Sequence, residues 1–178
     1  MTPDGRFGFT PERDQDTVSK VDLATRAIVK TASFPPGSRP WMLRVSPDGK
    51  AVWVQTGQAN TNVVLDTETL DVLQTTPAGR QPVEAAFQLN GGRYGLVTHF
   101  DDTFVLVLDR DSGREVGRVE VGKPQANASF SPDGATAFVS VSGANEVAVI
   151  DMASLAVVGR VPTGASPMGL VLLDPTQP

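Results

Sequence analysis

One histidine and two carboxylates lie close together in the chain. His99 is the only histidine among 178 residues, and Asp101 and Asp102 follow it. An imidazole beside a carboxylate can act as a general base, and both groups can ligate a metal. A metal site built on two histidines is excluded, and we predict neither a metal ion nor a cofactor. The cluster is therefore either an exposed, solvated loop or, if the protein is an enzyme, its catalytic group.

Three basic residues recur at similar distances along the chain: Arg39, Arg80 and Lys123. Each precedes a predicted strand. Cations that gather on one face attract anions through charge-assisted hydrogen bonds. With His99 they form the predicted ligand-binding set. The alternative is that these long side chains only cover the ends of the sheets.

Acidic residues occupy every second position at Glu12, Asp14 and Asp16. Their carboxylates offer the hard oxygen ligands that calcium prefers. The rest of a calcium-binding loop pattern is absent, so an exposed acidic loop is favoured. The sequence also lacks the glycine-rich phosphate loops and the nucleophile and zinc motifs of common enzyme families.

Composition excludes several function classes. The net charge is -5 and no basic cluster occurs, so nucleic acid is not an expected partner. The absence of cysteine excludes disulfides, thiolate zinc sites and a cysteine nucleophile. No apolar run approaches the roughly 18 residues of a membrane span, and Met1–Gly5 has no signal-peptide features. We expect no membrane span.

Two residue types, a glycine and an aspartate, recur along the chain with the same spacing. A turn glycine recurs at Gly5, Gly49, Gly92 and Gly134, and an aspartate that ends a predicted strand recurs at Asp22, Asp66, Asp109 and Asp151. By subtraction, both series have intervals of 44, 43 and 42 residues. A repeat of this length with several short strands and no helix predicts an all-β propeller, with one four-stranded antiparallel blade per repeat.

The predicted blades cover the whole chain as one propeller domain. The first blade lacks its first strand, and Pro167–Leu173 repeats the pattern of that strand. We therefore expect the C-terminal strand to complete the first blade and close the ring. Three arrangements stay open: a four-bladed monomer, an open arc of a larger propeller, and two chains that form one eight-bladed ring. The predicted blades are residues 1–36 with 167–175, 37–78, 79–121 and 122–164.

Propeller geometry predicts which side chains meet. The loops between the second and third strands of each blade and the connections between blades gather on one face around the channel, which we call the loop face. The predicted loops are 11–16, 57–61, 99–102 and 142–145. Glu84 and Asn127 are expected to face the channel, and Trp41 and Trp53 to pack between blades, with Trp41 near the channel mouth.

The repeat resembles the YVTN type of β-propeller. The resemblance rests on the turn Ser131-Pro132-Asp133-Gly134, the loop Gly143-Ala144-Asn145 and the end Val157–Gly164, and it extends over essentially the whole chain. It implies a fold like that of quinoprotein amine dehydrogenase heavy chains, haem d1 propellers, surface-layer proteins and lactonase-like propellers. It also implies a periplasmic or extracellular location, although no signal peptide is present.

Two hypotheses of function follow. The first is a non-catalytic binding or scaffold propeller, monomeric or homodimeric, that holds a small anionic ligand or a protein partner at Arg39, Arg80, Lys123 and His99. The alternative is an enzyme or enzyme subunit: a lactonase-like hydrolase that uses His99 with Asp101 or Asp102, or a fragment of a quinoprotein or haem d1 oxidoreductase.

Overall fold

The structure is a computed structural model and describes residues 1–170. These residues form fifteen strands and no helix, so none of them forms an apolar helix long enough to cross a membrane. The strands are β1 (Phe7–Glu12), β2 (Thr17–Asp22), β3 (Ala27–Ser33), β4 (Pro40–Val45), β5 (Ala51–Thr56), β6 (Thr61–Asp66), β7 (Val72–Pro77), β8 (Pro82–Phe87), β9 (Tyr94–His99), β10 (Phe104–Asp109), β11 (Glu115–Glu120), β12 (Gln125–Phe130), β13 (Thr136–Val141), β14 (Glu146–Asp151) and β15 (Ala156–Pro162).

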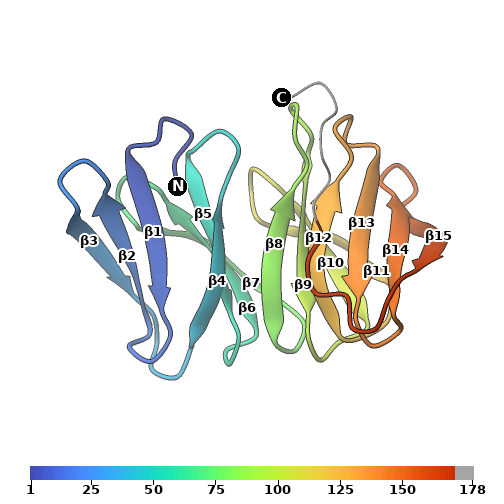
Figure 1. Ribbon diagram of the computed structural model, residues 1–178. Coiled ribbons are helices and arrows are strands. Elements are labelled where there is room, and N and C mark those ends of the chain that lie inside the picture. Colours follow the sequence, from blue (N-terminus) through green and yellow to red (C-terminus); the bar gives the residue numbers. More distant parts are fainter. Residues whose placement is uncertain (171–178) are drawn as a thin grey trace.

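The strands form four antiparallel sheets in chain order (Figure 1). Blade 1 is the three-stranded sheet β1-β2-β3, and blades 2, 3 and 4 are the four-stranded sheets that begin at β4, β8 and β12. Every strand pairs with its neighbour in sequence, so each blade is a simple meander. The fold is thus the all-β propeller that the repeat predicts.

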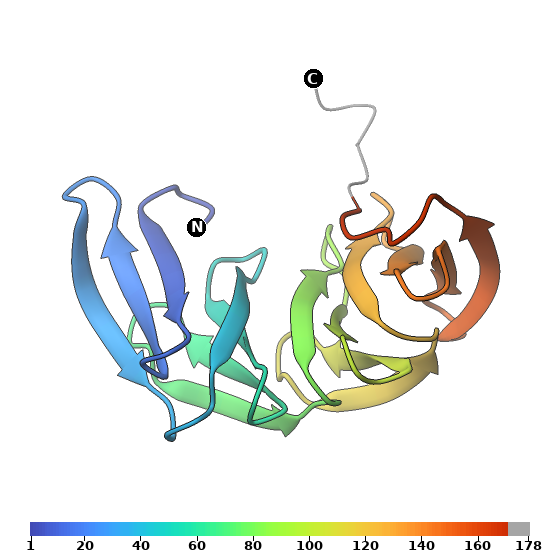
Figure 2. The same cartoon turned by 60° about the horizontal axis from the view of Figure 1, so that its bottom comes forward.

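The blades stand side by side in an open arc, with blades 1 and 4 at its two ends (Figure 2). The innermost strands β4, β8 and β12 are neighbours around the inner side of this arc. Blade 1 lacks the strand that corresponds to β4, β8 and β12 of the other blades. Its first strand, β1, corresponds to β5, β9 and β13.

The predicted closure is not seen in the described residues. Residues 167–170 form no strand, and the rest of the predicted strand Pro167–Leu173 lies outside the described residues. Blade 1 therefore remains three-stranded over residues 1–170.

The central strands explain why the blades stack. Each blade has a leading face toward the next blade in chain order and a trailing face toward the preceding one. In blade 3, Leu106 and Leu108 pack in one cluster with Trp53 of blade 2, whereas Val105 and Val107 pack in another with blade 4. A strand that is apolar on both faces is buried between two neighbours.

The repeated aspartate closes the turn after the third strand of each blade. A carboxylate oxygen of Asp66 accepts hydrogen bonds from the backbone N–H groups of Glu68 and Thr69, each at 2.8 Å. Asp109 accepts from the Ser112 backbone N–H at 3.0 Å and from its hydroxyl at 2.8 Å. These bonds and the Arg93 guanidinium lower the pKa of Asp109 to about 2. The regular spacing of this residue therefore reflects a turn.

Candidate functional site

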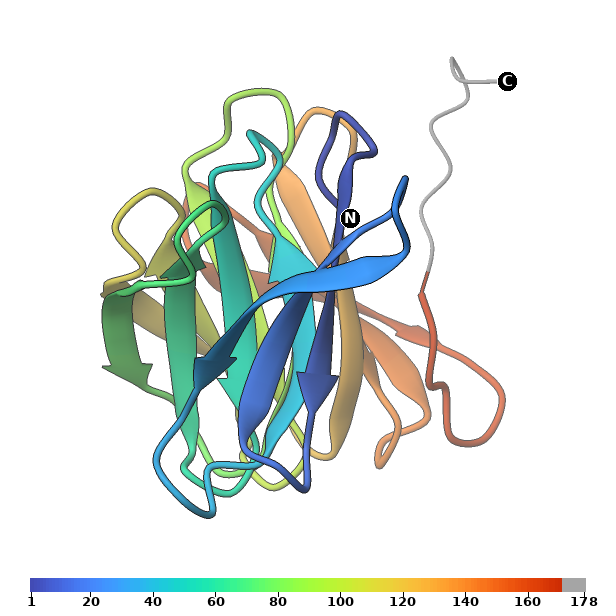
Figure 3. The ribbon, with the colours of Figure 1, turned by 90° about the vertical axis from the view of Figure 1, so that its left-hand side faces the viewer.

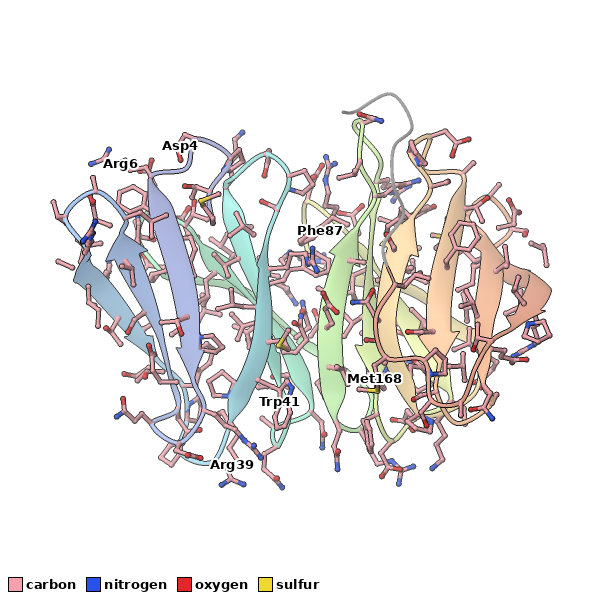
Figure 4. All side chains as sticks on the ribbon, viewed as in Figure 1. Asp4, Arg6, Arg39, Trp41, Phe87 and Met168 are labelled. Carbon is pink, nitrogen blue, oxygen red and sulfur yellow. The ribbon has the colours of Figure 1, made fainter. Side chains whose placement is uncertain are left out.

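A cavity of about 370 Å³ opens on the loop face, where blades 1, 2 and 3 meet. Its walls combine two arginines with aromatic and apolar side chains. Arg39 and Trp41 lie at the lower end of the molecule in Figure 4, at the opposite end from Asp4 and Arg6. The lining residues are Arg13, Arg39, Trp41, Gly57, Gln58, Gln81, Pro82, Val83, Phe100 and Met168.

Arg13 is the cation of this cavity that has no ion-pair partner among the described residues. Its guanidinium carbon lies 4.3 Å from the centroid of the Trp41 ring, a distance typical of a cation–π contact. Within residues 1–170 no carboxylate forms an ion pair with Arg13. Trp41 is 47% exposed although it is large and apolar. The pair therefore offers a positive charge and an aromatic surface to a bound molecule.

Arg39 contributes the second charge of the cavity. Its guanidinium pairs with Asp14 at 3.6 Å, and the two side chains are 48% and 85% exposed. Solvent-exposed pairs of this kind are weak. Arg39 can therefore turn to an anionic ligand at little cost. Its predicted role in ligand binding stays a prediction, but its side chain does line the cavity.

The acidic residues of the first hairpin have separate structural roles. The Asp16 carboxylate accepts hydrogen bonds at 2.6 Å from the backbone N–H groups of both Arg39 and Gly37, and these bonds lower its pKa. Glu12 accepts from the Thr17 hydroxyl at 2.9 Å. Within the described residues no group of three metal-type side chains converges. The calcium alternative for Glu12, Asp14 and Asp16 has no geometric support.

The structure corrects the register of the predicted cations. Arg39 has a left-handed backbone and its N–H contacts Asp16 of the preceding hairpin; Gln81 has the same backbone and contacts Asn60 in the same way, at 2.9 Å. Gln81, and not Arg80, is therefore the equivalent of Arg39. The shared feature is an Asx side chain that holds the connection between blades, which residue charge alone does not reveal.

Arg80 and Lys123 lie on the loop face but their charges are compensated. Lys123 Nζ lies 3.1 Å from an Asp101 oxygen, and Arg80 lies 3.9 Å from Asp101 and 3.6 Å from Asp102. The hydrogen bond from Lys123 and the charge of Arg80 lower the pKa of Asp101. The three predicted cations therefore do not form one site. Of the three, only Arg39 lines the cavity, whereas Arg80 and Lys123 pair with aspartates.

His99 is not on the loop that the sequence predicts. It is the last residue of β9 and is fully buried. Its Nε2 accepts a hydrogen bond from the Gly79 N–H at 3.0 Å, and its Nδ1 lies 2.9 Å from the Phe104 carbonyl. Burial lowers the imidazole pKa to about 4. The prediction of an exposed imidazole beside Asp101 and Asp102 is wrong, because the strand continues through position 99.

The channel wall contains a polar contact across three blades. Glu84 of β8 forms an ion pair with Arg44 of β4 and accepts a hydrogen bond from the Asn127 side chain of β12. Both predicted channel residues thus use their polar atoms to join neighbouring blades. Both oxygens of the Glu84 carboxylate therefore take part in contacts between blades.

Nine of the ten lining residues were not among the predicted site residues, and four of these nine contribute large side chains: Arg13, Trp41, Phe100 and Met168. Arg13 and Phe100 belong to hairpins that the repeat places on the loop face. Met168 follows the last described strand. Their convergence depends on the curvature of the arc, for which the sequence carries no simple signal.

No family model and no curated protein matches the chain. The YVTN resemblance therefore remains a prediction. Solved structures do match, and the three described below are β-propeller proteins. Dihydro-heme d1 dehydrogenase NirN, in complex with DHE, is 27% identical with a TM-score of 0.76. The periplasmic gluconolactonase PpgL of Pseudomonas aeruginosa is 28% identical with a TM-score of 0.75. Hydrazine synthase of Kuenenia stuttgartiensis is 26% identical with a TM-score of 0.70.

The chain is shorter than these neighbours. The matches cover 94% of the chain and 37% of NirN, 94% and 54% of PpgL, and 79% and 41% of hydrazine synthase. The chain thus spans about half or less of each. All three neighbours are named as enzymes, so the comparisons favour the enzyme alternative over a non-catalytic scaffold.

Proposed function

We propose that this chain is the ligand-binding part of a propeller enzyme, and that the loop-face cavity takes a small organic anion with an apolar or aromatic body. One observation carries the proposal: Arg13, without a carboxylate partner among the described residues, lies over the exposed Trp41 ring in the cavity wall. An anion that binds there gains a charge-assisted hydrogen bond while its body contacts the aromatic ring.

The chemistry of the cavity wall defines its part in an enzyme. The lining side chains include two guanidinium groups and two amides, from Gln58 and Gln81, but no carboxylate or imidazole. These groups bind and orient an anion. They support substrate binding, whereas the buried His99 does not support a hydrolase built on an exposed His99–aspartate pair.

The comparisons support the same proposal at a coarser level. A dehydrogenase, a lactonase and a synthase share the propeller architecture with this chain. One of them is described as periplasmic, so we extend the proposal to a periplasmic location. The ligand class is inferred from the cavity of this chain and does not depend on the substrates of these enzymes.

Tryptophan fluorescence tests the site directly, because Trp41 is exposed and Trp53, the other tryptophan, is fully buried. Benzoate is a suitable probe because it combines a carboxylate with an aromatic ring, and benzyl alcohol is the neutral control. We expect saturable quenching by benzoate, weaker quenching by benzyl alcohol, and no saturable signal in Trp41→Phe. Equal quenching by both compounds would overturn the anion site.

A further inference from the structure

The leading face of blade 4 is apolar but uncovered within the described residues. Phe138 and Val149 are cross-strand partners, and so are Ser140 and Val147. Partners opposite one another lie on the same face of a sheet. Phe138, Val147 and Val149 are all partly exposed and belong to none of the buried clusters.

The equivalent pairs of the preceding blades are buried. Trp53 and Val64 in blade 2 and Leu96 and Val107 in blade 3 are 0% to 3% exposed, because the next blade covers each pair. The Phe138–Val149 pair repeats this pattern, so the sequence of blade 4 encodes a face that a further blade covers.

The contacts between blades can be compared by the sizes of the two residues that face each other. Trp53, on the leading face of blade 2, lies over Gly95 of blade 3, where a Cβ would be 2.6 Å from the indole ring. In the other two contacts smaller leading residues meet larger partners: Phe9 shares a cluster with Val52, and Leu96 shares one with Ala137. The largest ring, that of Trp53, therefore meets a glycine, and the smaller ring of Phe9 meets a valine.

Blade 1 offers such a glycine on its free trailing face. Gly8 of β1 occupies the position of Gly95 in β9, and it is paired with Val21 of β2. Figure 3 looks onto blade 1 from this end of the arc, and no other sheet lies in front of it. The nearest side chain to a Cβ at Gly8 is the flexible end of Leu23, at 3.2 Å.

The two serines of the end faces, Ser19 and Ser140, do not oppose contact. Ser19 of blade 1 shares a hydrogen bond of 3.1 Å with Thr31, and Ser140 of blade 4 accepts one of 3.0 Å from the Asn127 N–H. These hydroxyls already have partners within their own blades. Both residues are already buried, at 4% and 1% exposure, so covering the end faces changes their environment little.

The geometry points to a second copy of this chain as the occupant. The leading face of blade 4 of each copy packs on the trailing face of blade 1 of the other, with the Phe138 ring seated on Gly8. Two head-to-tail contacts of this kind close a ring of eight blades and leave no end face exposed.

Light scattering coupled to size exclusion tests the arrangement on the full chain. We expect a mass twice that of the 18.8 kDa chain. Gly8→Trp fills the seat of the Phe138 ring with a side chain larger than any at this position in the other blades and should give a monomer. Combining it with Phe138→Gly recreates the Trp53–Gly95 size relation with the two sides exchanged and should restore the dimer. Leu73→Asp changes an exposed apolar residue of β7 and should leave the dimer intact.

The outcomes separate the proposal from a folding defect. Circular dichroism should show the same sheet content in every variant, and restoration by the double variant cannot arise from misfolding. A monomeric wild-type protein, with its end faces covered by its own remaining residues or left open, overturns the proposal. So does an open series of larger assemblies, or a Gly8→Trp protein that remains dimeric.

Discussion

The Arg13 guanidinium carbon lies 4.3 Å from the centroid of the Trp41 ring, and both side chains line the same cavity. The two residues come from different blades: Arg13 follows β1, and Trp41 lies in β4. The contact therefore depends on how blades 1 and 2 stack. It brings a cation without a carboxylate partner among residues 1–170 next to an exposed aromatic ring, on which the proposed function rests.

Asp14 competes with an anionic ligand for Arg39. Its carboxylate lies 3.6 Å from the Arg39 guanidinium. Replacing it with asparagine removes this competition and one negative charge near the cavity. We expect Asp14→Asn to tighten benzoate binding by about two- to five-fold at low salt, because exposed ion pairs are weak and screened. Fluorescence titration measures the change.

Asp111→Asn is the matched control for Asp14→Asn. It removes the same charge from the turn between β10 and β11, away from the loop face. We expect no change in benzoate affinity. An equal gain in both variants would show that net charge, and not competition at Arg39, controls binding.

His99 makes stability depend on pH. Its folded-state pKa of about 4 is below the ordinary value of 6.5, so the unfolded state binds the proton more readily. The contribution of the neutral imidazole is fully present above pH 6.5 and is lost as the pH falls toward 4. A shift of this size corresponds to about 3 kcal/mol over the whole window.

Urea denaturation at pH values of about 7.5 and about 4.5 isolates this contribution when wild type is compared with His99→Gln. The variant keeps a polar side chain but has no group that titrates in this range. We expect the wild type to lose about 2 to 3 kcal/mol more than the variant on acidification. An equal loss in both proteins would contradict the role assigned to His99.

Gly95 provides the space for the Trp53 indole, which also packs edge-on against Phe87 with ring centroids 4.8 Å apart. A methyl group at Gly95 would meet the indole at 2.6 Å. We expect Gly95→Ala to cost about 1 to 3 kcal/mol of unfolding free energy through overpacking. Gly117→Ala, in the same blade, meets only Leu155 at an ordinary 3.7 Å and should change stability much less.

The fold was predictable because the repeat constrains it strongly. The recurring aspartates end a strand and close the following turn, so their spacing sets the register of the blades. Strands β2, β6, β10 and β14 all end at the recurring aspartates, as predicted. The open arc was one of the predicted alternatives, but the choice depends on how the end blades pack, which the spacing of landmarks does not encode.

The candidate site was less predictable. Arg39 lines the cavity, and its place before a strand is visible in the sequence. Arg80 was placed one residue away from the position equivalent to Arg39, because Gln81 carries no charge that marks this position. His99 was misplaced because a polar residue at the end of a strand looks like the start of a loop. Its burial depends on Gly79 and Phe104, which contact it only in the folded blade.

Calorimetric titration of benzoate into Arg13→Gln and Arg80→Gln tests the central claim most directly. Both variants lose one loop-face arginine, but Arg13 lines the cavity without a carboxylate partner among the described residues, whereas Arg80 pairs with Asp101 and Asp102. We predict that Arg13→Gln weakens binding by about ten-fold or more, as expected for the loss of a charge-assisted hydrogen bond, while Arg80→Gln changes it less than about two-fold. Equal losses in the two variants, or a loss confined to Arg80→Gln, would contradict the assignment of the cavity as the anion site.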